Sequence, residues 1–287
     1  MNIISLVLFG TQTRYWYTLL TSVIGNLELY PDFAIRLHIS NDVRSHPASE
    51  VLDELSDRLP LQVFEFPDAY ADTEPSMWRM RPLWDTNVQR FLCRDVDSVP
   101  TTEEIQATRF WFKSDLPVHS IRSFHLHDIL LMAGLCGFDN TKLQIVRDQV
   151  KDFDHYIALF KQRGCQNPIF TWSCDQKALS MMFDGLRSFV YDCPIGNCGP
   201  HHIGLGIATL DKSTLHTEAL ADLNQDLLRI CDEIMAVPWG EFKGFAGRPI
   251  GDTRSQLKEM LKLDLPSCAA IRDIFDKKPS IKAFYEP

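Results

Sequence analysis

The sequence predicts an α/β protein with a central, mostly parallel sheet flanked by helices, and two observations support this fold class. Short apolar runs alternate with amphipathic segments through residues 3–66, which is typical of repeated βαβ units. The chain also has 287 residues, of which 45% are hydrophobic and 23% charged, so it can bury one large core.

The first elements follow from the spacing of their apolar residues. Residues 3–10 form an apolar run that predicts a strand, and the segment after Tyr15 predicts a helix that ends near Gly25. Residues 33–40 and 61–66 predict two more strands, with a helix over 48–59 between them. Parallel sheets bind ligands at the carboxyl ends of their strands, near a switch in strand order, so we expect this part of the chain to bind a nucleotide.

The later part of the chain continues the alternation. We expect a helix over 76–85 that stops at Pro82, an apolar strand at the start of 89–100, a helix over 101–112 capped by its threonine, short strands within 118–138, helices over 142–162 and 175–183, a strand at 188–192, a helix over 213–235, a loop at 242–249 and a helical tail over 252–277. We therefore divide the chain into a domain spanning 1–250 and a helical C-terminal extension spanning 251–287.

Charge and hydropathy exclude several classes of protein. The chain has 29 basic and 38 acidic residues and a formal net charge of −9, which argues against general nucleic-acid binding. The apolar run from Ile3 to Phe9 is far shorter than the ~20 residues of a membrane helix, and no basic stretch precedes it as in a signal peptide. We therefore expect a soluble, cytoplasmic protein.

The eight cysteines form no CxxC pair, which favours reduced thiols over a disulfide framework. Cys193, Cys198, His201 and His202 lie close together in sequence. Their spacing matches no standard zinc pattern, so we expect buried thiols beside a polar loop.

The most informative segment is an Asp-Val-Asp turn between an expected strand and an expected helix. Carboxylates at positions i and i+2, here Asp95 and Asp97, can face one point and suit a divalent cation that also takes phosphate oxygens. Such a cation offsets the negative charge of a diphosphate leaving group. The tripeptide alone is not specific, because a solvated turn in which Asp97 caps the next helix gives the same pattern.

Further motifs surround this turn in a defined order. They are VLFG (7–10), LYPDF (29–33), MWRM (77–80) and CRDVDSVP (93–100), followed by Glu103, Trp111, Ser114, His119, Arg122, Gly134, Gly137, Asp175, Gln176, Phe245 and Gly247. This ordered set, which covers most of residues 3–248, resembles the GT-A-fold glycosyltransferases. Within them it resembles a small bacterial and viral group whose metal motif reads Arg-Asp-x-Asp-Ser.

The resemblance implies a GT-A, Rossmann-like fold and a metal-dependent transfer of a sugar from a UDP- or GDP-sugar to a hydroxyl of a glycan or other acceptor, with retention of configuration. It implies Mn²⁺ or Mg²⁺ as cofactor, with Asp97 on the metal and Asp95 facing both metal and ribose. A late histidine, His202 or His201, is the expected third ligand, although a solvated loop histidine is the alternative.

Other residues at matching positions are candidates for the donor site, namely Phe9, Gly10, Arg14, Trp78, Arg79, Arg94, Asp95 and Gly134. Trp78 is equally explained as a core residue. Arg94 is expected to lie near the nucleotide or to brace the turn, and a surface salt bridge is the alternative. The run from Phe110 to Phe112, with Trp111 at its centre, predicts core on one side and an acceptor platform on the other.

Two residues are candidates for catalysis by the same resemblance. Asp175 corresponds to an acid that lies at the sugar, as a base for the acceptor hydroxyl or as a group that stabilises oxocarbenium-like charge. N-capping of the next helix is its alternative role. Arg122 is expected to pair with a phosphate or the donor sugar, because a guanidinium matches such oxygens, or else to form a structural ion pair.

The chain departs from the group at four positions. Ser123 replaces an acid, Phe124 a common histidine, Val99 a basic residue and Arg248 an acidic one. These departures motivate a second hypothesis, a non-catalytic protein of the same fold that binds nucleotide-sugars or carbohydrates. A third hypothesis, a viral enzyme that glycosylates modified DNA bases, needs a basic groove, which the net charge disfavours.

Overall fold

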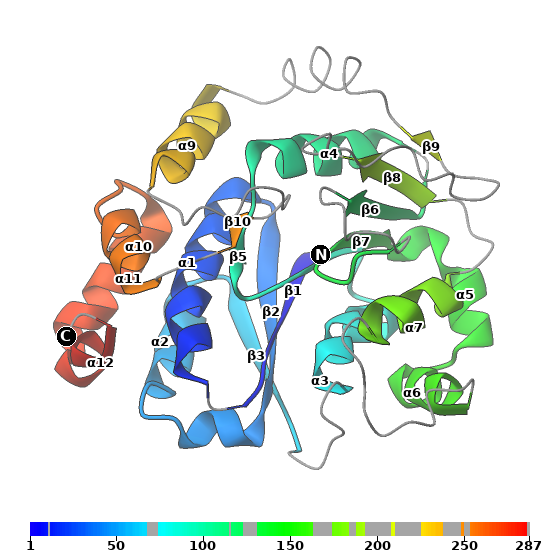
Figure 1. Cartoon of the computed structure of the whole chain (residues 1–287), viewed down its shortest axis with the longest axis horizontal. Coiled ribbons are helices and arrows are strands. Elements are labelled where there is room, and N and C mark those ends of the chain that lie inside the picture. Colours follow the sequence, from blue (N-terminus) through cyan, green and yellow to red (C-terminus); the bar gives the residue numbers. More distant parts are fainter. Residues whose placement is uncertain are drawn as a thin grey trace.

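The computed structural model describes residues 1–10, 12–67, 74–114, 116–122, 131–162, 174–183, 188–192, 208–209, 225–237, 248–249 and 253–285. Its main sheet has eight strands in the order β3-β2-β1-β4-β7-β6-β8-β9 (Figure 1). These strands are β1 (Asn2–Leu8), β2 (Phe33–Ser40), β3 (Leu61–Phe66), β4 (Arg90–Arg94), β6 (Val118–Arg122), β7 (Leu135–Asp139), β8 (Ser188–Asp192) and β9 (Ala208–Thr209).

The sheet is mostly parallel, which confirms the predicted fold class. Five of its seven strand pairings are parallel. The exception is β7, which runs antiparallel to both of its neighbours, β4 and β6. Because β2 and β3 lie on one side of β1 and β4 lies on the other, the strand order switches between β1 and β4.

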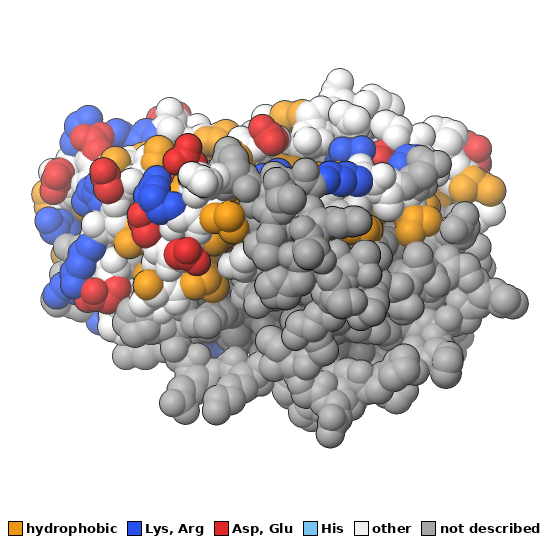
Figure 2. Space-filling view, turned by 90° about the horizontal axis from the view of Figure 1, so that it is seen from above, with side chains coloured by type: hydrophobic (Ala, Val, Ile, Leu, Met, Phe, Trp, Pro, Cys, Tyr) orange, Lys and Arg blue, Asp and Glu red, His pale blue; other side chains and the backbone are white. Residues whose placement is uncertain are grey.

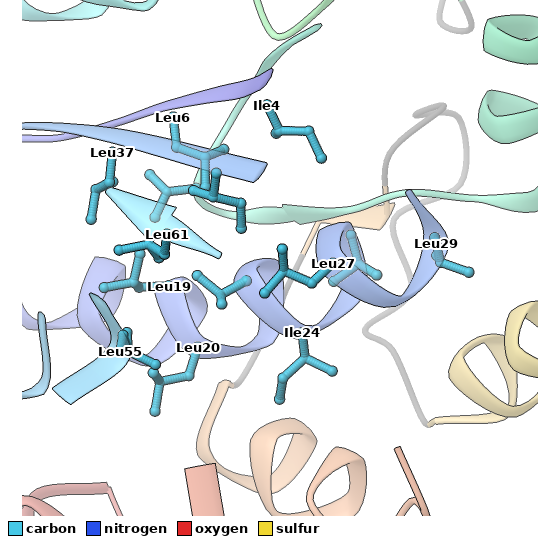
Figure 3. Close-up of a cluster of buried hydrophobic side chains, with 14 of the residues drawn as sticks. Ile4, Leu6, Leu19, Leu20, Ile24, Leu27, Leu29, Leu37, Leu55 and Leu61 are labelled. Atoms are coloured by element: carbon cyan, nitrogen blue, oxygen red, sulfur yellow. The ribbon is translucent and has the colours of Figure 1, made fainter. Parts of the chain in front are cut away.

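One face of the sheet is covered by α1 (Thr13–Leu29), α2 (Glu50–Arg58) and α4 (Thr102–Lys113). Successive side chains of a strand point to opposite faces, so Ile4 and Leu6 of β1 join this face while Ile3 and Val7 join the other. Figure 3 shows Leu6 of β1 and Leu37 of β2 on the side of the sheet that faces α1, whose Leu19, Leu20 and Leu27 belong to the same cluster.

The other face is covered by helical segments from the middle of the chain (Figure 1). They are α3 (Glu74–Met77), the 3₁₀ helix η2 (Trp78–Trp84), α5 (Gln144–Gln149), α6 (Phe153–Gln162) and α7 (Cys174–Met182). Residues 76–82 are helical as expected, but the helix does not stop at Pro82, because the short α-helix passes into a 3₁₀ helix that contains Pro82 and ends at Trp84. The helix expected over 142–162 is likewise divided, since the Asp152 carboxylate accepts from the His155 amide 2.7 Å away and starts α6 anew.

Helix α1 does not end near Gly25 but continues to Leu29. At Gly25 it passes directly under the short strand β5 (Ser98–Val99), and a Cβ on Gly25 would lie 2.6 Å from Cγ1 of Val99. The glycine thus serves close packing between helix and strand rather than helix termination.

The C-terminal part packs against α1. Helices α10 (Thr253–Met260), α11 (Pro266–Lys277) and α12 (Pro279–Tyr285) extend the expected tail to residue 285, and Figure 1 shows them beside α1. Leu257, Ile271 and Tyr285 belong to the same buried cluster as the α1 side chains. Helix α9 (Gln225–Ala236) accounts for the end of the helix expected over 213–235, and residues 210–224 lie outside the described residues.

A second small sheet joins distant segments. Strand β10 (Arg248–Pro249) lies antiparallel to β5, with Arg248 opposite Val99 and Pro249 opposite Ser98. Residues 248–249, expected in a loop, therefore form a strand beside the Asp-Val-Asp turn.

Two further observations concern the charge of the surface and the length of the helices. Figure 2 shows acidic and basic side chains interspersed over the C-terminal helices, on the face turned to the viewer. Among the described residues, no helix is both long and apolar enough to cross a membrane.

Candidate functional site

The Asp-Val-Asp turn lies at the point where the strand order switches. Asp95 directly follows β4, and Phe9 and Gly10 directly follow β1, its parallel neighbour. Gly10 has φ = +73°, a conformation that favours glycine. Sheets of this kind bind ligands at this place, so the structure brings three candidate residues to the edge where a ligand is expected.

Gly134 forms a cradle for the Asp95 carboxylate. Because β7 runs antiparallel to β4, with Leu135 opposite Arg94, the residue before β7 comes to lie beside the residue after β4. A Cβ on Gly134 would lie 2.0 Å from Oδ2 and 2.8 Å from Oδ1 of Asp95. No other residue fits at position 134 while the carboxylate keeps this place.

Arg79 links η2 to the turn. Its Nη1 donates to Oδ1 of Asp95 at 2.6 Å and its Nε to the Ser76 carbonyl at 2.8 Å, while 48% of the Asp95 side chain stays exposed. Burial lowers the pKa of Arg79, but the carboxylates of Asp95 and Asp175 outweigh it and raise the pKa above its usual value. Arg79 is therefore a permanent cation at the edge of the site.

Asp97 lies close enough to Asp95 for the charge of Asp95 to change its pKa. Burial, followed by the negative charge of Asp95, raises the pKa of Asp97 to about 6, although Arg14 and Arg79 act in the opposite direction. The charge of Asp95 thus makes the place of Asp97 a region of negative potential, which a cation relieves. Arg14 lies near this pair, exposed on the first turn of α1, and donates to the Tyr15 hydroxyl at 2.6 Å.

Asp175 belongs to the same electrostatic cluster although it is 80 residues further along the chain. It lies in the first turn of α7, after Cys174, so it is not the residue that caps the helix. Its Oδ1 accepts from the Gln176 amide at 2.9 Å. Burial raises the pKa of Asp175, Asp95 raises it further, and Arg79 lowers it.

The donor set fits a hard divalent cation in its chemistry. Asp95 and Asp97 provide carboxylate oxygens, and the Asp95 carboxylate is seated where a methyl group on Gly134 would otherwise lie. Within the described ranges, no three His, Cys, Asp or Glu side chains form a cluster that could hold a metal. The expected third ligand, His202, and its neighbour His201 lie outside those ranges.

Arg94 points away from the turn into the interior. Only 1% of its side chain is exposed, and it forms an ion pair with Glu104 of α4. A surface salt bridge is therefore the wrong description, and its position favours the bracing role over contact with a nucleotide. Trp78 is also buried, 2% exposed, and its ring lies 4.9 Å from that of Phe66 in the core.

Trp111 is a core residue as well. Its indole donates to the Leu116 carbonyl at 2.9 Å and stacks on His119 at 5.1 Å. Its neighbours Phe110 and Phe112 are partly buried and pack against the same core.

Arg122 is the last residue of β6, which is parallel to β4 because β7 is antiparallel to both. Its backbone therefore ends at the same edge of the sheet as Asp95, while its side chain lies outside the described part of the structure. Several other positions singled out in the sequence also lie outside it, namely Ser123, Phe124, Cys193, Cys198, Phe245 and Gly247.

Glu104, a buried acid that forms an ion pair with Arg94 next to the Asp-Val-Asp turn, was not predicted from the sequence. Glu104 lies in the first turn of α4, where stabilisation by the helix dipole would explain an exposed acid, yet only 1% of its side chain is exposed. Its position three residues after Thr101, whose side chain accepts from the Glu104 amide at 3.3 Å, marks the helix start but gives no sign of burial.

Comparison with known proteins gives structural likeness alone. No protein-family model and no curated protein matches the sequence. Among solved structures, the chain is similar to the glycosyltransferase GlyE of Streptococcus pneumoniae TIGR4, with 14% identity over 97% of this chain and 64% of the GlyE chain and a TM-score of 0.48. The chain thus spans less than two thirds of the length of GlyE.

Two further glycosyltransferases of known structure are similar to the chain. One is the mannosyltransferase PcManGT from Pyrobaculum calidifontis, solved with GDP-Man and Mn²⁺, with 10% identity over 99% of this chain and 84% of that one and a TM-score of 0.44. The other is the galactosyltransferase LgtC, with 12% identity over 74% and 73% and a TM-score of 0.43. At TM-scores below 0.5 these likenesses carry no argument about activity, which depends on the residues of this chain.

Proposed function

We propose that the protein is a metal-dependent glycosyltransferase that moves a sugar from a UDP- or GDP-sugar to a hydroxyl of a glycan or other acceptor. The observation that carries the proposal is the pair Asp95 and Asp97 at the switch point of a mostly parallel sheet, with one carboxylate seated against Gly134. The motif order across residues 3–248 supports the same assignment.

The donor would lie along the edge formed by the ends of β1 and β4. Asp95 and Asp97 would hold Mn²⁺ or Mg²⁺, with His202 as a third ligand, and the ion would supply positive charge for the diphosphate. Phe9 and Gly10 would approach the nucleotide through their backbone, and Arg14 and Arg79 would add cationic charge near the phosphates.

In the reaction, the bond between the anomeric carbon and the phosphate oxygen breaks, and a bond from that carbon to the acceptor oxygen forms. The nucleoside diphosphate leaves with the electron pair of the broken bond. The Asp175 carboxylate is the proposed acceptor of the hydroxyl proton, and its raised pKa brings it closer to the neutral range in which a general base works well. Arg122 would stabilise the departing phosphate.

A thermal-shift screen of UDP- and GDP-sugars with MnCl₂ tests the proposal. A bound donor stabilises the native state in proportion to its occupancy, so at least one nucleotide should raise the Tm of the wild type. Asp97→Asn should abolish the shift, whereas Asp148→Asn, an exposed carboxylate on α5, should keep it.

Release of UDP or GDP in the presence of acceptor sugars then separates the enzyme from the non-catalytic alternative. A chain that binds the nucleotide-sugar with metal but never releases the nucleotide supports the binding protein. A chain that shows no shift with any nucleotide contradicts both.

A further inference from the structure

A buried polar network lies directly behind the Asp-Val-Asp turn. Its members are Arg94, the last residue of β4, Glu104 in the first turn of α4, and Tyr30, which follows the last residue of α1. Arg94 and Glu104 are each 1% exposed and Tyr30 is 2% exposed. Three elements that meet at the turn therefore each contribute one buried polar side chain.

Arg94 connects the two strands that carry the site. Its Nη1 donates to the Cys93 carbonyl of β4 at 2.7 Å and to the Cys136 carbonyl of β7 at 3.1 Å. Cys136 is opposite Cys93 in the strand register, two residues after Gly134. The Arg94 guanidinium thus connects the end of β4, which Asp95 follows, to the start of β7, which Gly134 precedes. Gly134 is the residue against which the Asp95 carboxylate lies.

Glu104 holds that guanidinium in place. Its Oε1 accepts from Arg94 Nε and from the Tyr30 hydroxyl at 3.3 Å. Burial, and then the Glu104 charge, raise the pKa of Tyr30 above its usual value, so Tyr30 remains a hydroxyl donor at neutral pH. Tyr30 also lies 3.2 Å from Oγ1 of Thr108, one turn further along α4, which connects α1 to α4.

The ion pair of Arg94 and Glu104 contributes little to the net stability of the fold. Two of its buried atoms, Arg94 Nη2 and Glu104 Oε2, lack a hydrogen-bond partner in the described part of the chain. Desolvation of such a pair costs about as much as its attraction returns, so well-packed apolar residues of similar volume are often as stable. Apolar residues cannot donate the hydrogen bonds with which Arg94 connects β4 to β7.

We propose that Arg94, Glu104 and Tyr30 are positioning residues for the metal carboxylates. The network fixes the end of β4 against the start of β7 and so fixes the Asp95 carboxylate against Gly134. The inference rests on the proposed function, because it assigns the network a purpose at the same metal site.

Mn²⁺ binding, measured from the electron paramagnetic resonance signal of free Mn²⁺ with UDP or GDP present, tests the inference without any turnover. Glu104→Gln and Arg94→Lys keep the side-chain volume but lose the charge or the fork, and each should weaken Mn²⁺ binding at least tenfold. Tyr30→Phe removes one donor to Glu104 and should weaken it about two- to fivefold, a smaller loss because Arg94 keeps its bond to the carboxylate.

The matched control lies on the same strand. Arg90, at the other end of β4, donates from Nε to Oδ2 of the buried Asp139 at 3.1 Å. Arg90→Lys should lower Tm to a similar degree as Arg94→Lys but leave the Mn²⁺ affinity within twofold of the wild type. Equal losses of Mn²⁺ affinity in both variants would show a general effect of stability and overturn the inference.

If the single variants fail to fold, the double variant Arg94→Met/Glu104→Leu replaces both charges by apolar groups. We expect it to fold with a Tm close to that of the wild type and to bind Mn²⁺ at least tenfold more weakly. Wild-type affinity in this variant overturns the positioning role and leaves the proposed function intact. A wild-type protein that does not bind Mn²⁺ with either nucleotide overturns the proposed function and the inference together.

Discussion

A Cβ on Gly134 would lie 2.0 Å from Oδ2 of Asp95, so the Asp95 carboxylate occupies the space that a side chain just before β7 would need. Gly134→Ala must therefore displace the carboxylate or the strand. We expect Mn²⁺ affinity to fall at least tenfold, measured by calorimetry. Gly137→Ala is the control, because its Cβ would meet Leu92 at 2.7 Å and Trp111 at 2.9 Å in the core, and it should lower Tm while metal affinity stays unchanged.

The packing of Gly25 against Val99 gives a second prediction. Gly25→Ala places a methyl 2.6 Å from Cγ1 of Val99 and should lower the free energy of unfolding by about 1–3 kcal/mol, as overpacking usually does. Val99→Ala in the same chain makes room for the methyl. Urea unfolding of the four chains of this cycle should show a favourable coupling, and additive losses would mean that the two residues do not compete for space.

The raised pKa of Asp97 predicts the pH dependence of metal binding. Burial and the charge of Asp95 raise this pKa to about 6, and the carboxylate binds Mn²⁺ only when ionised. Apparent Mn²⁺ affinity should therefore fall below pH 6, by about tenfold at pH 5. Titrations at pH 5 to 8 check this, and an affinity that stays flat down to pH 5 contradicts it.

The same pKa predicts how the metal-free protein responds to pH. Between about pH 4 and 6 the folded chain holds a proton at Asp97 that the unfolded chain releases, so this group's contribution to stability is lost as pH rises through about 6. Asp97→Asn removes the cost of the buried charge. At pH 8 without metal, we expect it to unfold at higher temperature than the wild type, with the difference disappearing toward pH 4.

Asp175→Asn should separate binding from chemistry. If Asp175 takes the acceptor proton, kcat should fall by about 10²–10⁴ while the donor-induced thermal shift stays close to that of the wild type. Asp154→Asn, on the first turn of α6, is a suitable comparison because that helix packs on the same face of the sheet. A large loss of donor binding in Asp175→Asn would instead place the residue among the donor contacts.

The C-terminal helices should unfold together with the sheet. Tyr285 is buried, with its ring 5.6 Å from that of Phe275 and 5.9 Å from that of Tyr17 on α1. Tyr285→Ala should cost about 3–5 kcal/mol in one cooperative transition, whereas Tyr285→Phe should be neutral. Two separate transitions would support an independent unit after residue 250.

Much of the fold was predictable because apolar periodicity reports local structure. The strands at 33–40, 61–66 and 188–192 were predicted with the bounds that the structure gives. Gly25 was misread as a helix end, since the sequence does not show that Val99 packs on it from 74 residues away. The start of α6 was missed because a side-chain cap, Asp152, divides an otherwise continuous helical pattern.

The site was predictable where its residues are consecutive in the chain. Asp95 and Asp97 follow a strand directly, so their place at the sheet edge follows from local pattern and the rule for parallel sheets. The antiparallel return of β7, which brings Gly134 to Asp95, has no local signal. Glu104 has none either, because an acid in a first helical turn looks alike whether it is solvated or buried beside Arg94.

The pairing of β5 with β10 places two departures from the glycosyltransferase pattern next to each other. Val99 stands where that pattern has a basic residue and Arg248 where it has an acidic one, and the two face each other in the register. The basic and acidic residues of the pattern are replaced here by an apolar and a basic one, so this pair of positions changes from no net charge to a net charge of +1. The two departures are therefore neighbours in the fold, and together they add a positive charge beside the Asp-Val-Asp turn, which is the sign that an anionic ligand requires.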